Sequence, residues 1–226
     1  MELKKLIKNT SYLAGTRVVQ FFAGIVRTKI NAVLLGTTGI GIVNQLTFLT
    51  SSMSQFTMLS MSEAVVKQIA ESKDDEKIKD LVSASLKSYF VLVFSFLILS
   101  IIFFALYAQE LTVYVLGDTK YLPYYYIGLF SFPILILNSI PFAILKGFKD
   151  VKSISIARIG IIISNLLIFV PLVLLYGLKG AVIFIPLSYI ITVLFNYLLT
   201  RKYHLRRLNI QLSTIINAKI KKKFVK

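Results

Sequence analysis

The 226-residue chain contains six segments that are each long and apolar enough to cross a lipid bilayer. A transmembrane helix needs roughly 20 mostly apolar residues, because the hydrocarbon core is about 30 Å thick and a helix rises about 1.5 Å per residue. A chain that is 56% hydrophobic is also too apolar for a soluble domain of this size. We therefore predict an all-α integral membrane protein with spans at about 10–35, 39–64, 84–108, 121–145, 153–176 and 179–200.

The distribution of positive charge predicts the orientation of these spans. If the amino terminus is cytoplasmic, 21 of the 26 Lys and Arg residues, Arg158 among them, belong to cytoplasmic segments. Only Lys120 and Lys179 then lie in outer loops. This asymmetry is the positive-inside pattern of multi-pass membrane proteins. We predict that both termini are cytoplasmic.

The sequence divides into a membrane bundle and a basic tail. Residues 1–200 hold the six predicted spans, and residues 201–226 carry nine cations interleaved with apolar side chains. A basic amphipathic segment of this kind binds the anionic phospholipids of the inner leaflet. We predict that contact for the tail. No nucleic-acid partner is expected, although the formal net charge is +16.

The first span carries three cations, and two of them share one polar face. At about 100° per residue, the members of this face lie within roughly 80° of one another. They are Arg17, Gln20, Gly24, Arg27 and Asn31. Such a stripe is expected where a helix lines a water-filled cavity. The alternative is that the two arginines extend along their long side chains to the two membrane interfaces, but this leaves Gln20 and Asn31 unexplained. For Lys29, which lies off the polar face, extension to the interface is the better interpretation.

The second span is unusually polar, and Asn44, Ser51 and Gln55 fall on one of its faces. Two interpretations of this face stay open. The side chains could line the same cavity as the first span, or they could form hydrogen bonds between closely packed helices.

Three short segments resemble one family of membrane transporters. They are "KINAVLLGTTGIGIVNQL" (29–46), "EAVVKQIAES" (63–72) and "AILKGFKDVKS" (143–153). In order and spacing they are similar to the amino-terminal half of Wzx-type flippases, which handle lipid-linked oligosaccharides such as O-antigen units. These flippases belong to the superfamily that also contains the MATE-type multidrug exporters.

The resemblance implies a fold and an activity. The fold is one six-helix bundle of a two-bundle, MATE-like transporter with a central cavity. The activity is alternating-access transport of an undecaprenyl-pyrophosphate-linked oligosaccharide across the bacterial inner membrane. Because the family's members are about twice as long, we expect this chain to pair, either with a second copy or with a separate second-half chain.

The lipid-linked oligosaccharide implied by the resemblance suggests that the polar stripe of the first span binds the transported molecule. Arg17 and Arg27 would hold the pyrophosphate through charge-assisted hydrogen bonds, although these two assignments rest on the helix geometry and not on the resemblance. The amide side chains would meet sugar hydroxyls; they are Gln20, Asn31, Asn44 and Gln55.

Other function classes fit the sequence less well. The chain has no cysteine, one histidine and no phosphate-binding glycine loop on its cytoplasmic side, so we expect neither an enzyme nor a bound metal or cofactor. A cation-coupled multidrug exporter would favour an acidic cavity, whereas this one is predicted to be cationic. A non-transporting scaffold of a polysaccharide assembly complex would not depend on the arginines.

Overall fold

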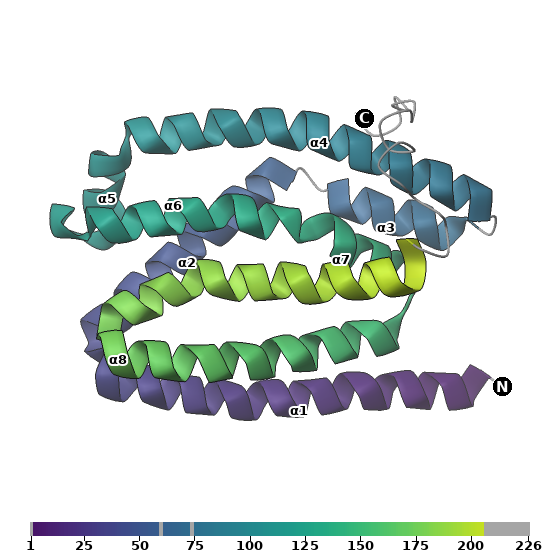
Figure 1. The fold of residues 1–226 in the computed structure, drawn as a ribbon, viewed down its shortest axis with the longest axis horizontal. Coiled ribbons are helices and arrows are strands. Elements are labelled where there is room, and N and C mark those ends of the chain that lie inside the picture. The colour runs from purple at the N-terminus through teal and green to yellow at the C-terminus, as the bar shows by residue number, and fades with distance from the viewer. Residues whose placement is uncertain (1, 59–60, 73–74, 206–226) are drawn as a thin grey trace.

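The computed structural model describes residues 2–58, 61–72 and 75–205 as a bundle of helices (Figure 1). Its elements are α1 (Glu2–Leu34), α2 (Gly36–Met58), α3 (Met61–Glu71), α4 (Asp75–Leu106), α5 (Ala108–Leu116), η1 (Thr119–Tyr121), α6 (Leu122–Leu137), α7 (Ser139–Gly147), α8 (Val151–Thr200) and η2 (Arg201–Leu205). Every regular element in this part of the chain is helical, as the sequence predicts.

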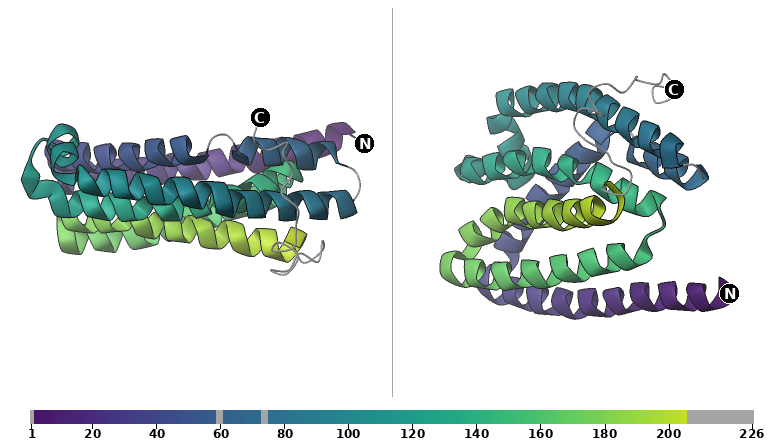
Figure 2. Two further views of the ribbon diagram at one scale, coloured as in Figure 1. Left: turned by 90° about the horizontal axis from the view of Figure 1, so that it is seen from above. Right: turned by 45° about the vertical axis from the view of Figure 1, so that its right-hand side comes forward.

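Helix α8 reverses direction at Gly177, so that its two limbs lie side by side (Figures 1 and 2). Gly177 has φ 52° and ψ −130°, a backbone conformation that a residue with a Cβ rarely adopts. We call residues 151–176 the first limb and residues 178–200 the second limb. They correspond to the predicted spans 153–176 and 179–200.

The predicted span 121–145 is broken at Asn138, between α6 and α7. Pro141 lacks a backbone N–H and its ring crowds the preceding turn, so the helix is interrupted just before it. Pro133, by contrast, lies inside α6 without ending it.

The predicted span 39–64 covers most of α2 and the start of α3, and residues 59 and 60 between them lie outside the described residues. The structure has two helices there, with α2 ending at Met58 and α3 beginning at Met61. Helix α3 runs against α7 and buries Val65 and Ile69 in the same apolar core.

Two described helical stretches are long and apolar enough to cross a membrane, namely Thr119–Gly147 and Val151–Leu205. A third candidate is the pair Leu97–Leu106 and Ala108–Leu116, which is bent by 79°. Length and composition thus support two or three crossings in the described residues, and the count of six stays a prediction. The polar residues of α1 and α2 lower their hydropathy, which is why these two helices are not among the candidates.

The long helices lie roughly parallel, with α1 at one edge and α4 at the other (Figure 1). Helix α1 packs mainly on α8, while α2 crosses the bundle obliquely and packs mainly on α6. The exposed face of α4 is apolar, with Phe94, Leu99 and Ile102 more than half exposed. An apolar surface of this extent is expected to contact lipid or another protein.

Candidate functional site

Two cavities adjoin one another between α1 and α8. The first, of about 240 Å³, is lined by Arg27, Gly24 and Asn165 together with Gln20 and Ile162. The second, of about 320 Å³, is lined by Arg17 and Arg158 and again by Gln20 and Ile162. We call them the Arg27 cavity and the Arg17 cavity, and the two together the arginine groove. The shared lining residues make them neighbouring parts of one surface, which carries both polar and apolar side chains.

In the Arg27 cavity, the guanidinium group lies over two aromatic rings. Its central carbon is 4.9 Å from the ring centroid of Phe169 and 5.2 Å from that of Phe184. The two rings are buried and meet edge to face, with centroids 5.0 Å apart. These cation–π contacts orient the arginine without a carboxylate that would neutralise it.

In the Arg17 cavity, two guanidinium groups come from different helices. Arg17 belongs to α1 and donates a hydrogen bond from Nη1 to Gln20 Oε1 at 3.2 Å. Arg158 belongs to the first limb of α8 and lines the same cavity. Neither this cavity nor the Arg27 cavity is lined by Asp or Glu. Within the described chain, the groove therefore presents positive charge and neutral polar groups.

Arg158 is the site residue that sequence reasoning missed. From sequence it counts among the cytoplasmic charges, but α8 begins at Val151 and places Arg158 two turns inside the helix. A signal for this position exists, because Arg158, Ile162, Asn165 and Phe169 recur at spacings of four, three and four. That spacing puts them on one helix face, and all four line the groove.

The wall of the Arg17 cavity includes a pair of asparagines. Asn196 Nδ2, on the second limb, donates to Asn138 Oδ1 at the α6–α7 break, at 2.7 Å. Thr192 lies one turn away and lines the same cavity. In the Arg27 cavity, Asn165 Oδ1 is buried and has no hydrogen-bond partner among the described residues. The groove thus offers amide groups beside its cations.

The structure brings together Arg17, Gln20 and Arg27 of the six residues predicted for the site. Asn31 lies further along α1, half-buried, and lines neither cavity. Asn44 and Gln55 are exposed on α2 and also line neither cavity. Helical periodicity groups residues on one face, but it does not determine which helix that face packs against.

In the described residues, no group of three or more His, Cys, Asp or Glu side chains is placed to hold a metal ion. The polar groups that the described residues bring to the groove are guanidinium, amide and hydroxyl groups, which suit binding of an anionic, hydroxyl-rich ligand.

No curated protein and no solved structure matches the chain. A family model described as "Polysaccharide biosynthesis protein" matches residues 6–224, which is nearly the whole sequence. Together with the long apolar helices, this match makes the chain a membrane protein with a role in polysaccharide synthesis or export. The chain belongs to the polysaccharide biosynthesis protein family.

Proposed function

We propose that the chain moves a polyprenyl-pyrophosphate-linked oligosaccharide across the bacterial inner membrane by alternating access. In this proposal it spans the membrane six times, with both termini in the cytoplasm. The observation that carries the proposal is the arginine groove, in which Arg17, Arg27 and Arg158 line two adjoining cavities and no carboxylate of the described chain joins them.

The chemistry of the groove suits a pyrophosphate. An anion that leaves water needs charge-assisted hydrogen bonds, and a guanidinium group offers a planar pair of donors to phosphate oxygens. An arginine within a membrane span is itself costly unless it faces a polar cavity or an opposite charge. A bound pyrophosphate would supply that charge to the three arginines.

Two positions along the groove can hold the headgroup. Arg17 and Arg27 are ten residues apart on α1, which is about 15 Å along the helix axis. We propose that the pyrophosphate occupies the Arg17 cavity with Arg158 at one stage of transport and the Arg27 cavity at another. Gln20 lines both cavities and would contact the cargo at each stage.

The exposed apolar side chains of α1 provide a surface for the second bundle that such a transporter needs. Val18, Phe21 and Phe22 are each more than half exposed. Large exposed apolar side chains beside a polar groove fit a protein partner that covers both. We propose a second six-helix bundle there, from another copy or from a separate chain. The predicted contact with anionic phospholipids belongs to the tail, residues 201–226, of which 206–226 lie outside the described residues.

The multidrug-exporter alternative is less well supported by this groove. A site for cationic drugs and coupling ions would be stabilised by carboxylates, whereas the described lining is cationic. A scaffold would keep its function without the arginines, whereas a transporter would lose it. A genetic experiment therefore separates the two.

Complementation of a flippase-deficient bacterium tests the proposal. Expression of the chain, with a candidate second-bundle chain where one is needed, is expected to restore surface polysaccharide. The Arg17→Ala/Arg27→Ala variant is expected to abolish the rescue at an equal membrane level, because each headgroup position loses one arginine. Full rescue by this variant would contradict transport through the groove and support the scaffold.

A further inference from the structure

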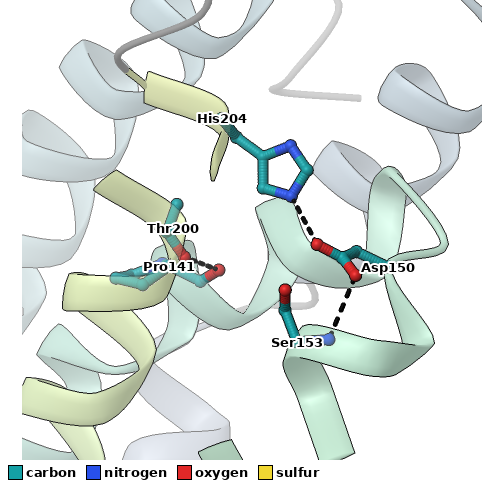
Figure 3. Close-up of polar contacts among 5 residues, drawn as sticks. All are labelled: Pro141, Asp150, Ser153, Thr200 and His204. Atoms are coloured by element: carbon teal, nitrogen blue, oxygen red, sulfur yellow. Dashed lines mark hydrogen bonds and ion pairs between the residues drawn. The ribbon is translucent and has the colours of Figure 1, made fainter. Parts of the chain in front are cut away.

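Three polar side chains on one face of the last helical stretch tie it to the region around α7. Asn196, Thr200 and His204 recur at intervals of four residues, so they lie above one another on one face. Asn196 Nδ2 donates to Asn138 Oδ1 at 2.7 Å, Thr200 Oγ1 donates to the Pro141 carbonyl at 3.0 Å, and His204 Nε2 lies 3.1 Å from Asp150 Oδ2. We call this series of three contacts the polar clamp; Figure 3 shows its last two.

The partners of the clamp sit where the backbone is irregular. Asn138 occupies the break between α6 and α7, Pro141 has no N–H, and Asp150 ends the turn from α7 into α8. Lys149, in that same turn, has φ 52°, which is uncommon for a residue other than glycine. Contacts at such points join the second limb to the α6–α7 break and to the turn between α7 and α8.

Asp150 connects both limbs of α8. Its Oδ1 accepts from the Ser153 N–H at 3.0 Å and caps the first limb, while its Oδ2 meets His204 at the end of the second limb (Figure 3). The His204 ring also stacks on Phe148, with centroids 4.3 Å apart and an interplanar angle of 9°. Burial alone would raise the pKa of the Asp150 carboxyl, but hydrogen bonds from Ser153 and His204 outweigh it and hold the pKa below its usual value. The carboxylate is therefore charged at neutral pH.

One contact of the clamp is also part of the groove. Asn138 and Asn196 line the Arg17 cavity, beside the guanidinium groups of Arg17 and Arg158. A phosphate oxygen in that cavity is a stronger acceptor for Asn196 Nδ2 than the neutral Asn138 amide, because hydrogen bonds to charged acceptors are stronger. An anion bound by the two arginines would compete for this contact.

We propose that the polar clamp is a ligand-responsive latch. An anion in the Arg17 cavity draws Asn196 away from Asn138, and the second limb then separates from α7 down to His204. This inference rests on the proposed function, since it takes a pyrophosphate as the ligand. It adds a residue-level link between occupancy of the groove and the arrangement of the helices at the end where His204 lies.

The latch is tested by a distance measurement across it. The chain has no native cysteine, so Lys152→Cys and Lys202→Cys, both at exposed positions on either side of the Asp150–His204 contact, can each carry a nitroxide label. Pulsed electron paramagnetic resonance in lipid nanodiscs then reports the distance between them. We expect one main distance without ligand and a second, longer population with inorganic pyrophosphate. A control label pair at the exposed Lys120 and Lys179 is expected to stay unchanged.

Variants of the clamp separate its role from general stability. Thr200→Val keeps the side-chain shape and removes one hydrogen bond, so the longer population without ligand is expected to rise roughly fivefold. His204→Gln is expected to give a similar rise. Unchanged distance distributions in both variants would overturn the latch.

Pyrophosphate binding, measured on the same labelled protein, keeps the two proposals distinguishable. Binding without any change in the Lys152–Lys202 distance would overturn the latch and leave the proposed function standing. Absence of binding would contradict the proposed function itself.

Discussion

Replacing Arg17 and Arg158 together by glutamine is expected to weaken pyrophosphate binding in the Arg17 cavity by roughly 100-fold or more. Both side chains line the Arg17 cavity, and no Asp or Glu of the described chain lines it with them. A hydrogen bond to a charged group contributes about 1.5–3 kcal/mol, so the loss of one such bond from each arginine gives a factor of this size. The quantity to measure is the dissociation constant of inorganic pyrophosphate for the purified chain at fixed ionic strength. It is measured with and without the double change in an Arg27→Gln background, which removes the second headgroup position.

The matched control for this double variant is Lys29→Gln. Lys29 is an exposed cation on the same helix and lines neither cavity. We expect its affinity for pyrophosphate to stay within about twofold of wild type, since interactions between exposed, separated charges are largely screened. Equal losses in Lys29→Gln and in the double variant would mean that net charge, and not the groove, binds the anion.

The largest expected loss of stability comes from Gly180→Ala. Gly180 is buried just after the reversal of α8, and an added Cβ would collide with the backbone carbonyl oxygen of Leu172. The carbonyl carbon of Leu172 would lie only 2.6 Å away and Cβ of Tyr176 3.1 Å away. A backbone group on the opposite limb moves only if the two limbs separate, so we expect a destabilisation of about 3 kcal/mol.

Thermal unfolding in detergent measures this effect, with Gly41→Ala as the control. A Cβ at Gly41 meets nothing within 4 Å, and the residue lies within helix α2, where alanine is favoured over glycine by roughly 1 kcal/mol. We expect the control to unfold at or slightly above the wild-type temperature. A Gly180→Ala variant as stable as wild type would show that the limbs of α8 are not held as closely as described.

Several elements of the fold could be predicted because they depend on local chemistry. The reversal of α8 follows from a glycine between two apolar runs, and the break before Pro141 follows from the missing N–H. The stripe of Arg17, Gln20 and Arg27 follows from helical periodicity, and these three side chains line the two adjoining cavities, with Gln20 in both. Each of these features involves only residues close together in the sequence.

Features that depend on contacts between distant segments were not predictable in the same way. The packing of α3 on α7 through Val65 and Ile69 joins segments that are far apart in the sequence. The placement of Asn44 and Gln55 outside the two cavities depends on α2 packing mainly on α6. Arg158 was missed because a cation near a predicted span end was counted as a loop charge. The spacing of residues within one helix does not show which other helix it packs against.

Transport of a fluorescent polyprenyl-pyrophosphate-linked sugar in reconstituted vesicles tests the central claim most directly. The vesicles contain the chain, with its second-bundle partner where one is required, and a membrane-impermeant quencher reports the labelled lipid that has crossed. We predict wild-type rates for Lys29→Gln and the rate of empty vesicles for the Arg17→Gln/Arg27→Gln/Arg158→Gln variant. Transport by the triple variant at the wild-type rate, with equal protein in the vesicles, would contradict the account.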